Sequence, residues 1–339
     1  MEEEDAFDGA SIIVVNTNTG TLHRMSVGNH TTEDVFLLAS VSKVPSVSLL
    51  MALENDPDLA FDVDEFIEAY LPWNGVYPEV STAQLVGNIS GIPGLLAANR
   101  YGAHLCQYAA AGQFPNADQL QDCAKVIYET PLEGTTAPGI AFDYGGSQWH
   151  LAGAVAEIVG GDSWNNLFQQ YIGAPCDLEV FEYGNMFFDT SAWTGFPDSL
   201  KGRSNPNIEG GAMSNIDDLG KLLRMHLNDG LCGSNRVISA EQAQRMRIDI
   251  GTELGSREWL NNGRGYGLGW WVPPFEGKQP TFFDDPGAFG SVSWIDLERG
   301  YGAFVALAQY ENLIAARTGP ARIIPELIPI IENIFDNPG

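Results

Sequence analysis

The sequence predicts an α+β fold in which strands from both ends of the chain form one antiparallel β-sheet flanked by helices. Strand-like runs lie near the two ends of the 339 residues, whereas the middle of the chain has mainly helical periodicity. We therefore expect residues 1–37 and 202–339 to form a sheet lobe, and residues 38–201 to form an inserted, mainly helical lobe. An active site is expected in the cleft between the two lobes.

The predicted strands are short runs of β-branched and aromatic residues between turn signals. Residues 11–17 (SIIVVNT) and 21–27 (TLHRMSV) flank a turn rich in Asn, Thr and Gly, and this pattern predicts a β-hairpin. Further strands are expected at residues 266–272, 291–297 and 302–310. The glycines in the first of these three indicate a strand that bends or packs closely against a neighbour.

The predicted helices have apolar residues about 3.6 positions apart and capping residues at their starts. They are expected at residues 147–161, 162–173, 214–230, 239–246 and 320–335. Asp162 is the expected N-cap of the second helix. Ser214 with Asp217, and Ser239 with Gln242, predict capping boxes for the third and fourth. Two prolines in the last segment should kink or break its helix.

The charge of the chain excludes several kinds of partner. It has 44 acidic and 17 basic residues, so its formal net charge is −27. Such a surface repels phosphate backbones, and we expect no nucleic-acid partner. No apolar run reaches the ~18 residues that a membrane span needs, so no membrane insertion is expected either. The pattern is typical of a solvated acidic surface suited to salty or extracellular water.

Four cysteines, Cys106, Cys123, Cys176 and Cys232, allow three disulfide pairings. The even count favours two disulfides, most simply Cys106–Cys123 and Cys176–Cys232; the alternative is four free thiols in a cytosolic enzyme. Histidines do not lie at zinc-ligand spacings around them, so no metal site is expected. Disulfides would imply an extracytoplasmic protein, periplasmic or secreted. Because residues 1–10 do not resemble a signal peptide, we expect that a leader has been removed.

The segment SVSK, residues 40–43, carries the most informative pattern. The chain has only five lysines, yet Lys43 lies in an apolar, predicted helical segment three residues after Ser40. Residues three apart share one face of a helix, and burial of Lys43 would lower its pKa. A neutral amine within reach of the Ser40 hydroxyl could act as its general base. The alternative is an ordinary helix start with a lysine that extends to water.

Several segments, in the same order along the chain, resemble the serine β-lactamase and penicillin-binding-protein superfamily. Within it, the sequence is most similar to class C β-lactamases and family VIII carboxylesterases. The matching segments are ASVSK (39–43), ISGIPG (89–94), FDYGG (142–146), NPNIEGGAMSNIDDLGKLL (205–223), GYGLGWW (265–271) and DDPGAFGSVSWID (284–296). Asn88 stands where the superfamily usually has a histidine.

The resemblance implies a role for each residue of the site. Ser40 would be the acylated nucleophile and Lys43 its base partner. Tyr144 would pass the proton to the leaving group and activate the water for deacylation. The backbone N–H groups of Ser40 and Ala288 would form the oxyanion hole. No cofactor or metal ion is implied.

Two departures from the superfamily pattern concern substrate binding. The second motif of the superfamily is usually Tyr-x-Asn or Tyr-x-Ser, but here it reads Tyr144-Gly145-Gly146. Gly146 lacks a side chain that could bind a substrate amide. The third motif usually begins with Lys or His, but here it reads Asp285-Pro286-Gly287. An anionic Asp285 would repel the carboxylate of penicillins and cephalosporins.

The sequence therefore predicts a serine hydrolase, most simply a carboxylesterase, that acts on a small-molecule ester or amide through an acyl-enzyme. One alternative is a peptidase or amidase for D-amino-acid peptides, or a weak β-lactamase. Another is a non-catalytic binding protein of the same fold. Loops such as residues 74–79 and 261–266 are expected to determine substrate choice.

Overall fold

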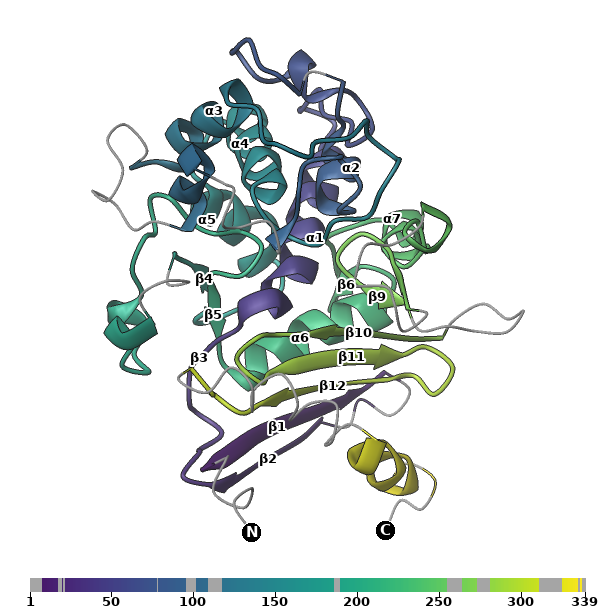
Figure 1. Ribbon diagram of the computed structural model, residues 1–339. Coiled ribbons are helices and arrows are strands. Elements are labelled where there is room, and N and C mark those ends of the chain that lie inside the picture. Colours follow the sequence, from purple (N-terminus) through teal and green to yellow (C-terminus); the bar gives the residue numbers. More distant parts are fainter. Residues whose placement is uncertain are drawn as a thin grey trace.

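The main sheet of the protein joins the two ends of the chain, which confirms the predicted α+β class (Figure 1). The computed structural model describes residues 8–17, 20, 22–77, 79–95, 102–108, 118–185, 190–254, 264–272, 281–310, 325–334 and 336. In these residues, seven antiparallel strands form the sheet in the order β2-β1-β12-β11-β10-β9-β8. Their bounds are Leu22–Gly28, Gly9–Asn16, Tyr301–Ala306, Val292–Asp296, Phe282–Pro286, Trp271–Val272 and Gly265–Tyr266.

Two details of the sheet differ from the prediction. The single strand expected at residues 266–272 is instead two short strands, β8 and β9, joined by a tight turn. Gly269 in this turn has φ of +90°, a conformation that favours glycine, and its backbone packs beside Val44. Strand β10 was not predicted, because Asp284, Asp285 and Pro286 are poor strand formers.

Each face of the sheet is covered by a helix (Figure 1). Helix α6 (Ile216–Leu227) packs on the inner face, where Gly220 approaches Ile13 closely. The helix of residues 325–334 packs on the outer face, where Ile331 joins Val14 and Trp294 in a separate core. Pro329 lies inside this helix, which continues to residue 334, so this proline does not break it as expected. Residues 320–324 of the predicted helix lie outside the described residues.

Helix α1 (Lys43–Glu54) forms the centre of the molecule, between α6 and the remaining helices (Figure 1). All of its residues from 43 to 53 are buried, as expected of a helix that is surrounded by protein on every side. The other α-helices are α2 (Thr82–Val86), α3 (Leu120–Glu129), α4 (Gln148–Gly160), α5 (Trp164–Phe168) and α7 (Ala240–Arg245).

Short elements complete the described structure. A small sheet has the order β3-β5-β4, and β6 pairs with β7 in a hairpin. These strands span Phe36–Leu37, Ala212–Ser214, Glu182–Tyr183, Leu231–Cys232 and Asn235–Arg236. Short 3₁₀ or π turns lie at η1 (Ala39–Ser42), η2 (Ile67–Ala69), η4 (Gly102–Tyr108), η5 (Gln169–Gly173), η6 (Thr190–Ala192), η7 (Pro197–Ser199) and η8 (Thr252–Leu254).

The predicted helix caps are partly correct. Ser239 forms the expected capping box at the start of α7. The N-cap of α5 is Ser163 and not Asp162, because the Ser163 side chain is the one that accepts the free backbone N–H. The expected box at Ser214 is wrong as well, since this residue ends strand β5 and Asn215 caps α6 instead.

Both predicted disulfides are present. Cys106–Cys123 joins η4 to α3 with a Cα–Cα distance of 5.6 Å, and Cys176–Cys232 joins the segment after η5 to β6 with a distance of 4.9 Å. All four cysteines are therefore paired. None of the helices in the described part of the chain is long and apolar enough to cross a membrane.

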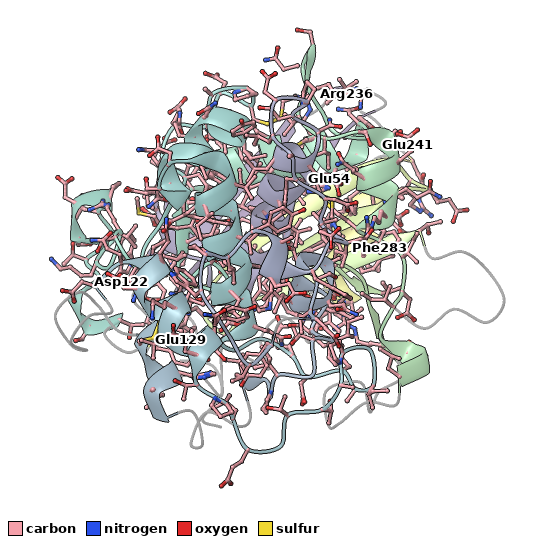
Figure 2. The ribbon with its side chains drawn as sticks, turned by 90° about the horizontal axis from the view of Figure 1, so that it is seen from above. Glu54, Asp122, Glu129, Arg236, Glu241 and Phe283 are labelled. Atoms are coloured by element: carbon pink, nitrogen blue, oxygen red, sulfur yellow. A yellow bond between two sulfur atoms is a disulfide. The ribbon has the colours of Figure 1, made fainter. Side chains whose placement is uncertain are left out.

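Acidic side chains project from the outer faces of several helices. In Figure 2, Asp122 and Glu129 on α3 and Glu241 on α7 all lie at the periphery of the molecule, and all three are exposed. Glu129 is paired with Lys125 one helical turn earlier. Surface pairs of this kind contribute little stability, so the acidic surface is mainly solvated.

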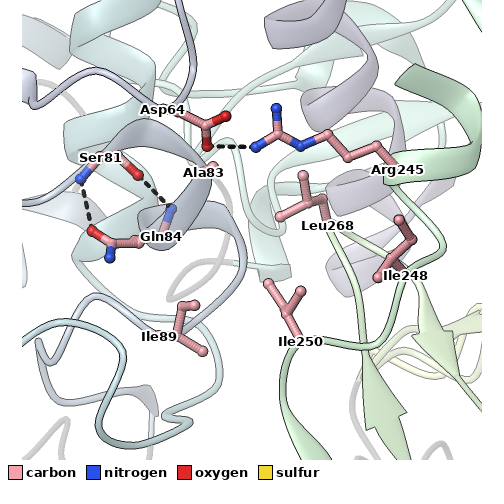
Figure 3. A pocket seen from close by; sticks show the side chains of 9 residues that line it. All are labelled: Asp64, Ser81, Ala83, Gln84, Ile89, Arg245, Ile248, Ile250 and Leu268. Atoms are coloured by element: carbon pink, nitrogen blue, oxygen red, sulfur yellow. Dashed lines mark hydrogen bonds and ion pairs between the residues drawn. The ribbon is translucent and has the colours of Figure 1, made fainter. Parts of the chain in front are cut away.

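A pocket of about 300 Å³ lies where α2 and the segment around α7 meet (Figure 3). Ile89, Ile250 and Leu268 form its apolar wall, and the ion pair between Asp64 and Arg245 crosses its rim. None of Ser40, Lys43 and Tyr144 lines it.

Candidate active site

Ser40 lies in η1, immediately before α1, and its side chain is partly exposed. The preceding residue, Ala39, has φ of +48°, which is unfavourable for a residue with a Cβ atom. Such a conformation costs on the order of 1–3 kcal/mol and persists only where packing enforces it. Ala39 is completely buried in a cluster with Leu37 and Met213, which provides this packing.

Lys43 begins α1, and only 1% of it is exposed. Its Nζ atom is 3.2 Å from Ser40 Oγ, so the two residues share one face of the helical segment as their spacing predicts. The same nitrogen donates to the backbone oxygen of Glu209 at 2.9 Å and lies 3.5 Å from Glu209 Oε2. Lys43 therefore does not extend to water.

Tyr144 lies in the turn that leads into α4, and it is 4% exposed. Its hydroxyl interacts with the side chains of Ser40 and Lys43, and Lys43 Nζ is 4.5 Å from the centre of its ring. Gly145 and Gly146 follow with φ of +69° and +88°, which favour glycine. The structure thus brings together the three residues that the sequence singled out.

Asn88 fixes the turn that carries Tyr144, a role that the sequence did not reveal. Its Oδ1 accepts hydrogen bonds from Gly145 N at 2.8 Å and from Trp149 Nε1 at 2.9 Å. Its backbone oxygen accepts one from Asp143 N at 2.8 Å. Asn88 has φ of +60°, which asparagine tolerates better than most residues. The only feature of the sequence that drew attention to Asn88 was that it stands where the superfamily usually has a histidine.

Gly287 and Ala288 lie in the turn between β10 and β11, next to the start of η1. A Cβ atom on Gly287 would be 2.4 Å from the backbone oxygen of Leu38, so this close approach requires glycine. The Gly287 N–H donates to Ser291 O at 2.7 Å and closes the turn. Gly287 thus lies against Leu38, two residues before Ser40, and half-buried Ala288 follows it in the turn; the oxyanion-hole role of Ala288 stays a prediction.

Asp285 lies on β10 and is completely buried. Its carboxylate faces the backbone N–H of Val44, but neither oxygen completes a hydrogen bond of normal geometry. Burial raises the pKa of Asp285 well above its usual range, although Lys43 and Arg264 act in the opposite direction. The repulsion expected between Asp285 and a substrate carboxylate therefore cannot come from an exposed anion, because Asp285 is buried and does not face the substrate as a surface charge.

The raised pKa of Asp285 predicts that this residue lowers stability at neutral pH. A carboxyl whose pKa is higher in the folded than in the unfolded protein destabilises the fold as pH rises above about 4. Asp285→Asn should therefore increase the free energy of unfolding more at pH 8 than at pH 4. Thermal unfolding at pH 4, where the gain should vanish, provides the comparison. An equal gain at both pH values would contradict this origin.

The structure corrects the expectation that Lys43 is neutral. Burial lowers the pKa of Lys43, but the hydrogen bond with Tyr144 and the charges of the Glu209 and Asp285 carboxyl groups together raise it above the usual range. Lys43 is thus an ammonium at neutral pH in the free protein. The pKa of Tyr144 is raised by burial, although Lys43 opposes this shift, so the phenol keeps its proton. The sequence suggested the opposite for Lys43 because it did not reveal these neighbours.

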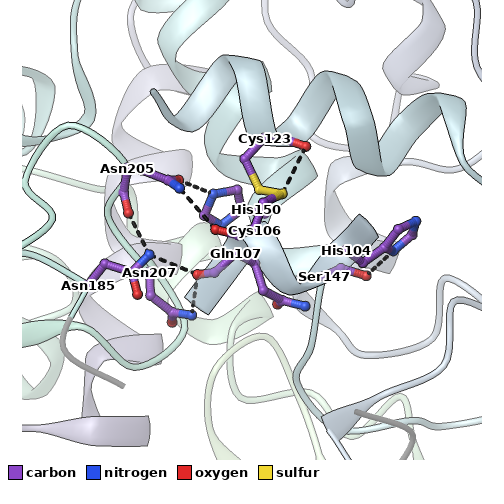
Figure 4. Close-up of a disulfide and its surroundings, with 9 residues drawn as sticks. All are labelled: His104, Cys106, Gln107, Cys123, Ser147, His150, Asn185, Asn205 and Asn207. Carbon is purple, nitrogen blue, oxygen red and sulfur yellow. Dashed lines mark hydrogen bonds between the residues drawn. A yellow bond between two sulfur atoms is a disulfide. The ribbon is translucent and has the colours of Figure 1, made fainter. Parts of the chain in front are cut away.

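The Cys106–Cys123 disulfide joins α3 to η4, whose His104 contacts Ser147 (Figure 4). The disulfide anchors η4, which contains His104. The Nε2 atom of His104 donates to Thr130 O at 2.7 Å. Its Nδ1 atom therefore accepts a hydrogen bond from the Ser147 hydroxyl at 2.9 Å. Burial lowers the pKa of His104 to about 4, so its ring is neutral. Ser147 follows the turn of Tyr144, and this contact therefore holds that turn in place.

Tyr108, at the other end of η4, reaches the site directly. Its hydroxyl is 3.5 Å from Glu209 Oε1. The backbone oxygen of Cys106 accepts a hydrogen bond from Asn205 Nδ2 at 3.0 Å, which ties η4 to the segment before Glu209 (Figure 4). Within the described residues, no group of three His, Cys, Asp or Glu side chains is arranged to hold a metal ion.

The fold together with Ser40, Lys43 and Tyr144 defines the class of protein: a serine hydrolase of the β-lactamase and penicillin-binding-protein superfamily. The profile of the Beta-lactamase family matches residues 1–323, and the chain belongs to this family.

Proteins similar to this chain include both penicillin-binding proteins and hydrolases. Penicillin-binding protein 4 of Amycolatopsis lactamdurans is 25% identical over 313 residues, which cover 85% of this chain and 75% of that protein. A putative β-lactamase from Bacteroides dorei has a similar structure, with a TM-score of 0.70 and 22% identity over 90% of this chain and 87% of that one. EstCE1, a hydrolase with promiscuous acyltransferase activity, has a TM-score of 0.72 and 17% identity over 94% of both chains.

Proposed function

We propose that this protein is a carboxylesterase that hydrolyses small-molecule esters through an acyl-enzyme on Ser40. The observation that carries the proposal is the position of Lys43, whose buried Nζ lies 3.2 Å from Ser40 Oγ with Tyr144 in contact with both. A lysine used only for stability would have no need of this serine and tyrosine. This arrangement argues against the alternative of a non-catalytic binding protein.

The reaction begins when Lys43 has lost its ammonium proton. The amine accepts the Ser40 proton as Oγ forms a bond to the ester carbonyl carbon. The backbone N–H groups of Ser40 and Ala288 stabilise the resulting oxyanion, each by roughly 3 kcal/mol. Tyr144 delivers a proton to the departing alkoxide as the carbon–oxygen bond breaks. Water then attacks the acyl carbon while the Tyr144 phenolate accepts its proton. The bond between the acyl carbon and Ser40 Oγ breaks, Lys43 returns its proton to Ser40 Oγ, and the acid is released.

The surroundings of Gly146 favour esters over amides. This residue has no side chain to bind a substrate amide, and its backbone N–H already donates to Glu209 Oε2 at 2.9 Å. The third motif supplies buried Asp285 where a cation would bind a substrate carboxylate, and nearby Arg264 is paired with Asp284. Neutral esters need neither interaction.

Labelling with a fluorophosphonate probe, followed by mass spectrometry, tests the nucleophile. We expect one adduct on Ser40 and none on Ser42, which is buried and donates its hydroxyl proton to Ala39 O. No adduct in the folded protein would favour the non-catalytic alternative.

Substrate preference tests the reaction class. We expect kcat/KM for p-nitrophenyl butyrate to exceed that for nitrocefin by about 10–100-fold or more, because a hydrogen bond to a charged group contributes about 1.5–3 kcal/mol. Among the described residues, the cation near the third motif, Arg264, is already paired with Asp284. D-Alanine p-nitroanilide serves as the third substrate. Preference for the anilide would support an amidase, and preference for nitrocefin a β-lactamase.

An extracytoplasmic location, periplasmic or secreted, is part of the proposal. Two disulfides support it, because such bonds persist mainly in oxidising compartments. The acidic composition, with a net charge of −27, suits a protein that must stay soluble outside the cell.

A further inference from the structure

Glu209 is a buried carboxylate that the mechanism above does not use. It lies just before β5 and is 1% exposed. Its Oε2 is 3.5 Å from Lys43 Nζ and accepts a hydrogen bond from Gly146 N at 2.9 Å. Its Oε1 is 3.5 Å from the hydroxyl of Tyr108. A charged side chain is rarely buried so completely unless it is paired, and these contacts supply the pairing.

The turn that carries Tyr144 leaves room for this carboxylate. A Cβ atom on Gly145 would lie 2.4 Å from Glu209 Oε2, and the next residue is also a glycine. A side chain at position 145 would displace the Glu209 carboxylate, whereas Gly145 lets it reach both the Gly146 N–H and Lys43. The two glycines and Glu209 thus form one structural unit.

The backbone around Glu209 is fixed to α1, so the carboxylate is held at a defined position. Ser46 Oγ donates to Ile208 O at 2.6 Å, and Ser42 Oγ accepts from Ala212 N at 3.1 Å. Lys43 Nζ itself donates to the Glu209 backbone oxygen at 2.9 Å. Glu209 therefore contacts Lys43 through both its main chain and its side chain.

Glu209 is the anion best suited to balance the charge of Lys43. Among the described residues, the other titratable groups that face this pair are Tyr144 from the turn before α4, Asp285 from β10, Tyr108 from η4 and Tyr266 from β8. Tyrosines are neutral near pH 7. Burial raises the pKa of Glu209, but the Lys43 ammonium and the donors from Gly146 and Tyr108 act in the opposite direction. Asp285 has no comparable donors, since neither of its oxygens makes a hydrogen bond of normal geometry.

We propose, on the basis of the proposed function, that Glu209 is a positioning residue that holds Lys43 beside Ser40 and keeps it as an ammonium in the free enzyme. Its carboxylate thereby sets the pH above which Lys43 can accept the Ser40 proton. Hydrolysis itself still depends on Ser40, Lys43 and Tyr144.

The pH dependence of kcat/KM for p-nitrophenyl butyrate tests this role. Glu209→Gln keeps an oxygen for the Gly146 N–H but removes the negative charge, so Lys43 should lose its proton more readily. The rise of kcat/KM with pH should then move to lower pH by about one unit or more. Glu157→Gln, which changes a buried carboxylate on α4 that contacts Trp164 N and Gln121, should leave the rise where it is. An unmoved rise in Glu209→Gln would overturn the proposal.

A thermal-stability cycle tests the pairing without any assay of activity. Breaking a buried ion pair leaves one charge unpaired, so Glu209→Gln should lower Tm by about 5 °C in the wild-type background. In Lys43→Met, where no ammonium is present, the same change should lower Tm far less. Equal losses in the two backgrounds would refute the pairing. Because this cycle needs no hydrolysis, its result stands even if the wild type fails to hydrolyse esters or to react with fluorophosphonate.

Discussion

Ser40→Ala should lower kcat for p-nitrophenyl butyrate by about 10³-fold or more while the protein remains folded. The reason is that the acyl-enzyme needs the Ser40 oxygen, and no other hydroxyl of the site is placed as a nucleophile beside Lys43 in the described structure. Lys43→Met should lose nearly as much, and the double variant little more, because residues that act as a unit are not additive. Steady-state kinetics with circular dichroism of each variant checks both statements.

Ser48→Ala is a matched control for the nucleophile. Ser48 is buried on α1, the helix of Lys43, but its hydroxyl donates to Val44 O at 2.9 Å and lies 3.1 Å from His226 Nε2. This variant should keep kcat within about tenfold of the wild type, since surroundings of the reacting atoms are unchanged. If Ser40→Ala retained full activity, the assignment of the nucleophile would be wrong.

Removing the Cys106–Cys123 disulfide should lower both stability and activity. In the chain-entropy model, a cross-link between residues 17 apart stabilises the fold by about 3 kcal/mol. The Cys106→Ser/Cys123→Ser variant should therefore unfold at lower denaturant concentration. Its kcat/KM should also fall, because η4 carries the contacts of His104 with Ser147 and of Tyr108 with Glu209.

The second disulfide provides the control. Cys176–Cys232 links residues 56 apart, and its loss should cost about 4 kcal/mol. This disulfide joins the segment after η5 to β6. In the described chain, neither of these two segments contacts a site residue by hydrogen bond or ion pair. The variant should therefore keep its kcat/KM at a temperature where it is folded. Equal losses of activity in the two variants would contradict the supporting role of η4.

Thiol titration of the denatured wild type should find no free thiol before reduction and four after it. Four free thiols before reduction would refute both disulfides and the extracytoplasmic location.

Much of the fold could be predicted because its determinants are local. Two strand-like runs around a turn rich in Asn, Thr and Gly predicted the hairpin of β1 and β2, and Ser239 with Gln242 three residues later predicted the cap of α7. Strand β10 could not be predicted in this way. Its acidic and proline residues are poor strand formers, and pairing with β11 across the sheet decides their conformation. The split of residues 266–272 likewise depends on the approach of Gly269 to α1.

The sequence by itself determined the family, the two disulfides and the placement of Lys43 beside Ser40, since three-residue spacing on a helix suffices to bring those two together. Only the tertiary structure decided the charge state of Lys43 and the burial of Asp285. Glu209, which faces the Lys43 ammonium, is 166 residues away in the chain, and Asn88 is 57 residues from the turn that it fixes. A pKa depends on every charge and on the solvent excluded within a few ångströms, and these are set by how distant segments pack rather than by neighbours in sequence.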